Sequence, residues 1–389
     1  MSAGPEPLVV RVLHLIGSLK VGGAETVVTA LLRSSDHDRF QYTILILDRG
    51  PLMDELSCAP VRVMIQPFRW LTMPLWLLKT VRCLRALRID VVHTHLFGTD
   101  MLGRVAGRLA RVPVIVSTYH APSTWKQKRS GKYLLRKTLD ALTANCLTDG
   151  LTAISDAVST YQATTGQIRR DKLRVITNPV RCHRFRSDAD LRAAMRGELG
   201  VFEEERIVIN VSSLAPIKGQ AYLLRACPLL LDHPVRWRLL LVGDGPLRSE
   251  LERGAQSLGI TDRVFFLGQR RDVSDLLRAS DVFVMSSLSE GVSMAILEAM
   301  AAALPIVATR VGGNVDLIEP GHTGMLVEPR DESALAGAIR HLLDAPQEAA
   351  LLGCNARRHV RQHHDARLIA RQYEDYYREL LQRKQRARR

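Results

Sequence analysis

Short runs of aliphatic and β-branched residues alternate along the chain with longer segments whose apolar residues recur at helical spacing. In the first half, this pattern predicts strands at residues 8–16, 42–47, 61–65, 91–95 and 114–118 and helices at residues 25–33 and 74–88. Strands that alternate with helices predict βαβ units, and therefore a parallel sheet with helices on both faces.

A second series of the same kind follows an irregular, basic stretch at residues 181–205. Strands are predicted at residues 206–211, 237–242, 264–267, 282–285, 306–308 and 325–327, with helices at 220–231 and 247–258. The two series predict an α/β protein with two doubly wound domains. Sheets of this kind bind ligands at the carboxyl ends of their strands, so we expect the main site in a cleft between two facing domains.

The composition agrees with a two-domain globular protein. The chain has 389 residues, of which 46% are hydrophobic and 24% charged, and both fractions are close to those of average globular proteins. These values exclude a disordered chain, a fibrous repeat and a small disulfide-stapled scaffold, and the length suits two domains.

The chain is strongly basic, with 54 Lys and Arg against 40 Asp and Glu and a formal net charge of +14. Such a charge suits an anionic partner, which is a nucleic acid, an anionic membrane surface or a substrate that carries phosphate. Aromatic residues make up only 5% of the chain, which is few for a protein that stacks on bases along a strand.

The spacing of the cysteines and the length of the apolar runs indicate the cellular compartment of the protein. The six cysteines include no CxxC pair, which favours free thiols in a reducing compartment. The start of the chain does not have the pattern of a secretory signal, and no apolar run reaches the roughly 18 residues that a membrane span needs. We therefore expect a cytoplasmic protein.

Two glycines, Gly22 and Gly23, stand between the first predicted strand and the first predicted helix. They allow the backbone to approach a ligand, and the helix N-terminus favours an anion. The spacing is not that of a GxGxxG dinucleotide fingerprint. A tight turn without a ligand is the alternative interpretation.

A lysine, Lys218, lies directly before Gly219, between the strand predicted at residues 206–211 and the helix predicted at residues 220–231. Its ammonium group can point from there toward a phosphate. The segment is not a P-loop, because the upstream glycine and the GK[ST] ending are both missing. A solvated loop lysine is the alternative interpretation.

The strongest local signal is a pair of glutamates, Glu290 and Glu298, eight positions apart. Glu290 precedes a helix that is predicted to begin near Val292, and Glu298 lies about two turns inside that apolar helix. A carboxylate among apolar residues is costly to bury without a partner. Backbone N–H groups at the helix start form an anion site between the two carboxylates. One glutamate could then hold sugar hydroxyls, the amides a diphosphate and the other glutamate a ribose.

With these elements in order, the chain resembles the retaining, nucleotide-sugar-dependent glycosyltransferases of the large group 1 family, family 4. The resemblance covers nearly the whole chain, and its most specific part is the Glu290-x7-Glu298 element followed by Ala299-Met300-Ala301. The remaining segments that carry it are Gly22-Gly23-Ala24-Glu25, Asp90-Val91-Val92-His93-Thr94-His95, Thr118-Tyr119-His120, Ile154-Ser155, Val175-Ile176-Thr177-Asn178-Pro179-Val180, Val242-Gly243-Asp244-Gly245-Pro246, Pro305-Ile306-Val307-Ala308-Thr309 and Val311-Gly312-Gly313.

The resemblance implies the GT-B fold, in which two Rossmann-like domains face each other across a cleft and a C-terminal helix crosses back to the first domain. It implies an acceptor-side domain at residues 1–183 and a donor-binding domain at residues 184–365. Residues 366–389 would form the returning helix and a basic tail. It also implies that no cofactor and no metal are required, since a lysine and a helix terminus replace the divalent cation at the leaving group.

Three catalytic residues follow from the resemblance. Glu290 would hold the transferred sugar, Lys218 would neutralise the leaving diphosphate, and His120 would contact the donor sugar. Further donor-binding positions are the ribose-binding Glu298, the close-approach glycine Gly23, and the diphosphate-binding amides of Gly291, Val292, Ser293 and Met294.

One departure from the family pattern concerns Ser213, which also belongs to the predicted donor-binding loop. The family usually has Arg at this position, so a second cation at the pyrophosphate is missing from its usual place. Either another arginine supplies it, or Lys218 and the helix terminus suffice.

Two basic segments indicate a membrane partner. Residues 126–137 hold six basic and no acidic residues, and residues 357–389 hold 11 basic and four acidic ones, which gives a local charge of +7. One interpretation of each segment is a charged surface that only contacts solvent. The other is adhesion to an anionic membrane leaflet, where each Lys or Arg near the surface contributes about 1 kcal/mol to binding.

The resemblance thus implies retaining transfer of a hexose or N-acetylhexosamine from a nucleoside-diphosphate sugar to a glycan or lipid-linked glycan, in polysaccharide or glycolipid biosynthesis. We expect a peripheral location on the inner face of the cytoplasmic membrane and no nucleic-acid partner. Two alternatives remain, a GT-B nucleotide-sugar epimerase and a basic nucleic-acid-binding protein. A metal-dependent GT-A enzyme is disfavoured, because neither DxD tripeptide of the chain follows a predicted strand.

Overall fold

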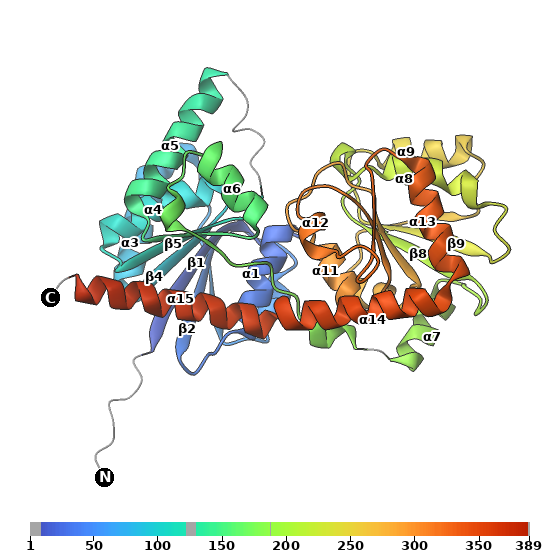
Figure 1. Cartoon of the computed structure of the whole chain (residues 1–389). Helices are drawn as coiled ribbons and strands as arrows, with labels where there is room; N and C mark the ends of the chain where they lie inside the picture. Colours follow the sequence, from blue (N-terminus) through green and yellow to red (C-terminus); the bar gives the residue numbers. More distant parts are fainter. Residues whose placement is uncertain (1–8, 122–129, 187, 388–389) are drawn as a thin grey trace, which may run out of the picture. The chain divides into compact units, whose positions relative to one another are not determined.

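The computed structural model describes residues 9–121, 130–186 and 188–387 and divides into two compact units (Figure 1). The first unit comprises Met1–Pro179 and Ala366–Arg389, and the second comprises Val180–Asp365. The boundary that was expected after residue 183 lies after Pro179, and the C-terminal helix belongs to the first unit as the GT-B prediction requires.

Within the described residues, the first unit holds one sheet of seven parallel strands in the order β3-β2-β1-β4-β5-β6-β7. The order reverses direction between β1 and β4, which creates a switch point at their carboxyl ends. The strands are β1 (Val10–Ser18), β2 (Phe40–Asp48), β3 (Val61–Ile65), β4 (Val91–His95), β5 (Val114–Tyr119), β6 (Gly150–Ala153) and β7 (Leu173–Val175).

The described part of the second unit holds a sheet of six parallel strands in the order β10-β9-β8-β11-β12-β13. Its switch point lies between β8 and β11. The strands are β8 (Arg206–Val211), β9 (Trp237–Val242), β10 (Val264–Gly268), β11 (Val282–Met285), β12 (Ile306–Thr309) and β13 (Met325–Val327).

Helices connect the strands and cover the sheets, as Figure 1 shows for each unit. In the first unit they are α1 (Gly23–Ser34), α2 (Met53–Leu56), α3 (Met73–Ala86), α4 (Phe97–Ala110), α5 (Gly131–Leu147), α6 (Asp156–Thr164) and α15 (Ala366–Arg386). In the second they are α7 (Ala189–Glu198), α8 (Gln220–Ala226), α9 (Arg248–Ser257), α10 (Val273–Ala279), α11 (Met294–Ala301), α12 (Asn314–Leu317), α13 (Glu332–Asp344) and α14 (Pro346–His363).

Each sheet has its own hydrophobic core. In the first unit, Leu13, Leu45 and Val92 from the strands pack with Trp76 of α3 and Ala106 of α4. In the second unit, buried residues of β8, β9, β11 and β12 pack with residues of α8 and α13. Strands covered on both faces read as nearly continuous apolar runs, which is why the sequence pattern located them.

The predicted α/β class with two doubly wound domains is confirmed, with two local differences. The strands β6 and β7 have four and three residues, too short for a clear apolar run. The helix predicted at residues 220–231 is divided into α8 and a 3₁₀ segment, Cys227–Leu230. Pro228 explains the change, because it has no N–H to continue the α-helical ladder. Among the described residues, no helix is both long and apolar enough to span a membrane.

Candidate active site

The loop after β8 places Lys218 at the switch point of the second sheet. Gly219 follows with φ +64°, and a Cβ atom there would lie 2.1 Å from the Ser286 carbonyl oxygen. Only glycine fits this close approach without strain. The Ser286 hydroxyl also donates to the Lys218 carbonyl oxygen at 3.1 Å. The loops after β8 and β11 are thereby held against each other.

This contact brings Lys218 and Glu290 together. Lys218 Nζ donates to Glu290 Oε1 at 2.6 Å, and the Ser287 hydroxyl donates to the same oxygen at 2.6 Å. The Lys218 side chain is 22% exposed and that of Glu290 9% exposed. A lysine and a glutamate that were predicted as separate ligand contacts therefore form one partly buried ion pair.

The helix α11 begins directly beyond this pair. Ser293 caps it, with its hydroxyl accepting a bond from the Ile296 N–H at 3.4 Å. The first turn of a helix presents N–H groups without intrahelical partners and carries partial positive charge. The predicted start near Val292 differs by two residues from the observed start at Met294, because Ser293 acts as the cap.

Two glycines fix the approach to α11. Cβ atoms at Gly312 and Gly313 would lie 2.0 Å from the Glu290 carbonyl oxygen and 1.8 Å from the Gly291 carbonyl oxygen. The turn after β12 therefore packs backbone to backbone on residues 290–291. Such close packing requires glycine at both positions, and it sets the path of the chain into the helix.

The other predicted donor residues of the second unit lie around the same sheet edge. Glu298 is half-buried on α11, within the second turn of the helix. Ser213 is exposed after β8, and its carbonyl oxygen accepts a bond from Gln220 Nε2 at 2.9 Å. The structure thus groups Lys218 and Glu290 with the start of α11.

In the first unit, the predicted residues Gly23 and His120 follow β1 and β5, at the carboxyl edge of the first sheet. Gly23 is the first residue of α1, and a Cβ atom there would meet nothing within 4 Å. Internal packing therefore gives no reason for glycine at this position. His120 follows β5, and its Nε2 lies 3.1 Å from His95 Nδ1.

His120 is electrostatically unusual. Burial lowers its pKa to about 4, because the interior disfavours the charged imidazolium. Its Nδ1 has no hydrogen-bond partner among the described residues. A neutral ring with one nitrogen free can donate to or accept from a ligand hydroxyl.

Sequence reasoning missed a group of histidines beside His120. The ring nitrogens of His14, His93 and His95 lie within 4.8 Å of one another, and all three residues are buried. The fold thus gathers in one place three histidines that the sequence patterns did not connect. His93 and His95 are two positions apart in one strand, which places both side chains on one face of the sheet. His14 joins them only because β1 and β4 are neighbours in the folded sheet.

Comparison with known proteins identifies the family. The model described as "Glycosyltransferase Family 4" matches residues 21–184, and the one described as "Glycosyl transferases group 1" matches residues 205–345. Together the two ranges cover most of the chain. This chain belongs to the family 4, group 1 glycosyltransferases.

One relative of this glycosyltransferase and one solved structure match over most of their length. The chain is 28% identical over 345 residues to the UDP-Gal:alpha-D-GlcNAc-diphosphoundecaprenol alpha-1,3-galactosyltransferase of Escherichia coli, covering 86% of this chain and 88% of the relative. The Anabaena HepE protein in complex with UDP-glucose superposes with a TM-score of 0.84 at 25% identity, covering 95% and 99% of the two chains. The lipopolysaccharide glycosyltransferase WaaG, at 18% identity and a TM-score of 0.75, shares the fold.

Two residues that were not predicted contact the predicted site residues. Ser287 shares the Glu290 oxygen with Lys218, and His95 binds the predicted catalytic His120. Ser287 carried no sequence signal, because an isolated serine after a strand is common. His95 was visible only as part of a family segment.

Proposed function

We propose that this glycosyltransferase transfers a hexose or N-acetylhexosamine from a nucleoside-diphosphate sugar to a glycan or lipid-linked glycan, with retention of anomeric configuration, in polysaccharide or glycolipid biosynthesis. The observation that carries the proposal is the Lys218–Glu290 pair at the start of α11. It combines one cation, one carboxylate and a helix terminus at a sheet switch point, where such folds bind ligands.

The ion pair gives each partner a role when the donor binds. The diphosphate draws the Lys218 ammonium group away from Glu290, and the N–H groups of Gly291, Val292, Ser293 and Met294 add hydrogen bonds. Glu290 is then released to accept bonds from sugar hydroxyls. Positive charge held in advance stabilises the leaving diphosphate most in the transition state, where its negative charge develops.

We propose that Glu298 accepts hydrogen bonds from the ribose hydroxyls of the donor. It is half-buried within the second turn of α11, beyond the N-terminus that would hold the diphosphate. This order along the helix matches the order of sugar, diphosphate and ribose in a nucleotide sugar.

The relatives support uridine as the base to test first. One of them is named for a UDP-galactose donor and a diphosphoundecaprenol-linked acceptor, and another was solved with UDP-glucose. A lipid diphosphate acceptor also agrees with the basic character of this chain, whose net charge is +14.

We further propose that turnover requires no divalent metal, because Lys218 and α11 can supply the positive potential at the leaving group. Activity should persist in excess EDTA. Loss of turnover in EDTA with restoration by Mn²⁺ would contradict this.

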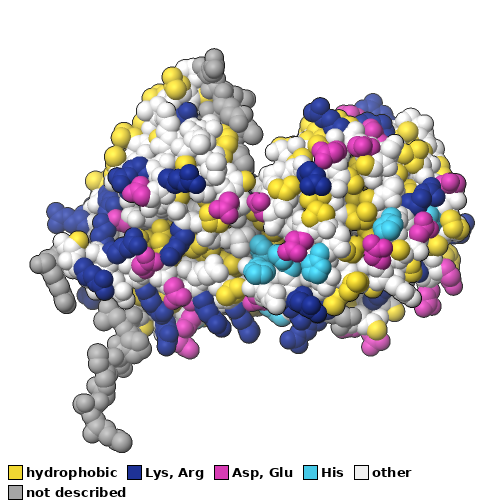
Figure 2. Space-filling model, viewed as in Figure 1, with side chains coloured by type: hydrophobic (Ala, Val, Ile, Leu, Met, Phe, Trp, Pro, Cys, Tyr) yellow, Lys and Arg dark blue, Asp and Glu magenta, His cyan; other side chains and the backbone are white. Residues whose placement is uncertain are grey.

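A peripheral position on the inner face of the cytoplasmic membrane is part of the proposal. In the first unit, Trp70 and Leu71 before α3 are 78% and 97% exposed, and Leu134 and Leu135 of α5 are 59% and 62% exposed. Both helices pack against α4. Figure 2 shows apolar side chains exposed on the first unit, including the region of α5. Exposed apolar groups that are flanked by cations favour an anionic lipid surface.

The basic segment predicted at residues 126–137 is described only in part. Lys126, Lys128 and Arg129 lie outside the described residues. Lys132 on α5 is exposed, whereas the Arg136 guanidinium lies 3.9 Å from the centre of the Phe97 ring. The described part therefore offers fewer solvated cations than the sequence count suggests.

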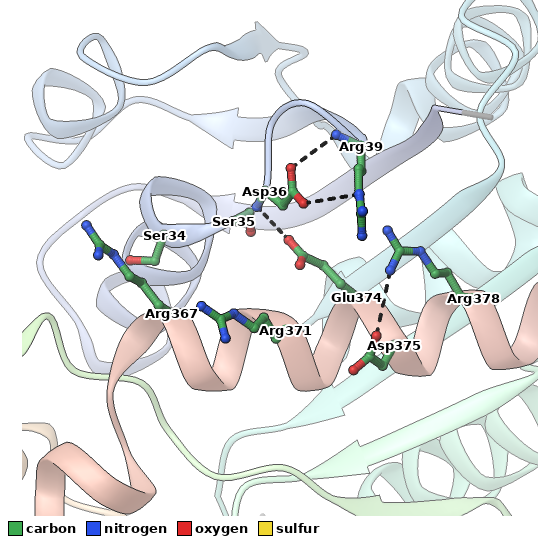
Figure 3. Close-up of a pocket in the computed structure, with 9 residues that line it drawn as sticks. All are labelled: Ser34, Ser35, Asp36, Arg39, Arg367, Arg371, Glu374, Asp375 and Arg378. Atoms are coloured by element: carbon green, nitrogen blue, oxygen red, sulfur yellow. Dashed lines mark hydrogen bonds and ion pairs between the residues drawn. The ribbon is translucent and has the colours of Figure 1, made fainter. Parts of the chain in front are cut away.

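Some of the positive charges in the basic C-terminal segment are also paired with acidic side chains. Figure 3 shows Arg367 and Arg371 projecting side by side from α15 into a pocket of about 530 Å³, together with Arg378, which pairs with Asp375 at 3.7 Å. Further along α15, Lys384 pairs with Asp149 at 2.6 Å. Arg371 remains as an exposed cation for which the described residues give no ion pair.

The decisive experiment is a donor screen followed by product analysis. Purified protein is incubated with UDP-, GDP- and ADP-sugars, and thermal stabilisation and donor hydrolysis are measured. With the active donor and a lipid-diphosphate acceptor, proton NMR of the product gives the anomeric configuration. Transfer with the donor's configuration is expected. An inverted product, or no response to any nucleotide sugar, would overturn the proposal.

A further inference from the structure

The strand register of the first sheet aligns a set of histidines on one face. His14 of β1 is paired in register with His93 of β4, and His95 with Thr118 of β5. Side chains two positions apart along a strand point to the same face. His93, His95 and the position two beyond Thr118, which is His120, therefore share the face that carries His14.

Three of these rings form a continuous hydrogen-bonded row. His14 Nδ1 lies 3.0 Å from His95 Nε2, and His95 Nδ1 lies 3.1 Å from His120 Nε2. The rings of His14 and His95 are nearly parallel, with an interplanar angle of 7°. His95 thus uses both ring nitrogens, and each of its partners uses one.

Burial keeps this row neutral. His14 is 2% exposed and His95 0% exposed. Burial lowers the pKa of His14 to about 3, and burial together with the neighbouring histidines lowers that of His95 well below its usual range. Each ring therefore carries a single N–H, which sits on one of its two nitrogens.

A row of neutral rings couples the three tautomers. If His14 carries its proton on Nδ1, it donates to His95 Nε2, His95 Nδ1 donates to His120 Nε2, and His120 Nδ1 carries the remaining proton. If His14 carries its proton on Nε2, both bonds reverse and His120 Nδ1 becomes an acceptor. In a neutral imidazole, the bond made by one nitrogen decides the protonation of the other.

We propose that His14 and His95 are positioning residues that hold His120 in one ring orientation and one tautomer, so that its free Nδ1 meets the ligand in a fixed hydrogen-bonding state. The consequence for catalysis rests on the proposed function, in which His120 contacts the donor sugar. The row of bonds itself does not depend on that function.

The same cluster does not favour a metal ion. His93 Nδ1 lies 2.6 Å from the Tyr377 hydroxyl, and His93 Nε2 lies 2.6 Å from the Thr118 hydroxyl. Both of its nitrogens are therefore used in hydrogen bonds, as are both nitrogens of His95, so an ion held by these two rings would have to break at least one bond of each.

The first test reads the tautomer directly and needs no substrate. The full chain is labelled with ¹⁵N-histidine, and long-range ¹H–¹⁵N correlation spectra distinguish a protonated Nδ1 from a protonated Nε2. The His120 signals are identified by their loss in His120→Asn. We expect one tautomer for His120 in the unmodified protein and a mixture in His14→Leu. Identical His120 patterns in both proteins would overturn the proposal.

The second test is kinetic. His14→Leu should lower kcat by tenfold or more, toward the roughly 10²-fold loss that a misplaced catalytic group can cause, with the donor KM changed less than about twofold. His14→Asn should recover most of the rate, because its amide can donate or accept near the position of Nδ1. Equal losses in His14→Leu and His14→Asn would contradict a hydrogen-bonding role.

Tyr377→Phe is the matched control. It removes the hydroxyl that binds His93 Nδ1 in the same buried cluster but leaves the row of three rings intact. The His120 tautomer and kcat should remain unchanged in this variant. If His120→Asn leaves kcat unchanged, the function assigned to His120 fails, while the spectra still decide whether His14 sets its tautomer.

Discussion

At the scale of single residues, the proposed donor site contains a charge pair, Lys218 and Glu290, to whose members we assign different tasks. Lys218 Nζ and Glu290 Oε1 lie 2.6 Å apart, so the two charges neutralise each other. Removing one member leaves the other charge partly buried and unpaired, which is costly. A variant at either position therefore changes both stability and ligand binding, and the two effects have to be measured separately.

Lys218→Ala should lower kcat by about 10²–10³-fold, the scale observed when a preorganised charge-stabilising group is removed. The comparison is steady-state turnover of the active nucleotide sugar. Arg225→Ala is the control, because Arg225 also pairs with a glutamate, Glu332 at 2.7 Å, but is 46% exposed. Equal turnover in Lys218→Ala and the unmodified enzyme would remove Lys218 from the mechanism.

Glu298→Ala should weaken nucleotide binding by about 10- to 100-fold, since hydrogen bonds to a charged group contribute about 1.5–3 kcal/mol. Calorimetric titration with UDP and GDP measures the dissociation constants. Glu250→Ala, at an exposed position of α9, is expected to bind the nucleotide normally. Unchanged affinity in Glu298→Ala would refute the ribose contact.

At the scale of elements, the site is built where loops meet at a sheet edge. The turn after β12 packs its glycine backbone on residues 290–291, and the loop after β8 packs on the loop after β11. Three loops that are separate in sequence thereby define the start of α11. The geometry of the proposed anion site therefore depends on these contacts as well as on α11 itself.

Gly313→Ala should disturb the site, because its methyl group would lie 1.8 Å from the Gly291 carbonyl oxygen. We expect a lower melting temperature and weaker nucleotide binding. Gly337→Ala is the matched control. Gly337 lies within α13, where a Cβ atom meets nothing within 4 Å, and alanine should stabilise the protein by about 0.4–1 kcal/mol. An unchanged melting temperature and unchanged nucleotide affinity in Gly313→Ala would show that the turn can shift to accommodate the methyl group.

At the scale of the whole molecule, the buried histidines link stability to pH. The pKa of His14 is lowered to about 3, whereas histidine in an unfolded chain titrates near 6.5. Below about pH 6.5 the unfolded chain binds a proton that the folded protein does not. The free energy of unfolding should therefore fall by about 1.4 kcal/mol per pH unit for each such histidine, and the effect is absent above pH 7.

Thermal unfolding between pH 7.5 and pH 5 measures this slope. His14→Asn should unfold with a shallower dependence on pH, because one proton-binding group is lost from the unfolded chain. A slope that is the same in both proteins would show that His14 is not buried in its neutral form.

Membrane attachment is the second property at this scale. The protein should sediment with anionic vesicles more than with neutral ones, and added salt should weaken binding, since electrostatic attraction decays over about 8 Å at physiological ionic strength. The double variant Lys132→Glu and Lys137→Glu on α5 should bind less. Reversing Arg225 and Arg253 in the second unit is the control. Equal sedimentation with neutral and anionic vesicles at low salt would contradict an electrostatic attachment.

The sequence by itself determined the elements and the chemistry that each loop carries. Periodicity located strands such as Trp237–Val242 and Val282–Met285 at their observed bounds, because residues buried on both sheet faces form nearly continuous apolar runs. The placement of Glu290 and Glu298 around the start of a helix could be predicted for the same reason. Both features depend only on residues that are close together in the chain, and a sequence pattern contains that information.

Only the tertiary structure decided which distant groups meet. Lys218 and Glu290 are 72 positions apart, and His14 and His95 are 81 apart. Period-two alternation tells which side chains share a strand face, but the order and register of strands decide which of them touch. Burial, which keeps the histidines neutral, also arises only when helices cover the sheet. The ion pair and the row of histidines are therefore products of packing, and the sequence supplied only their members.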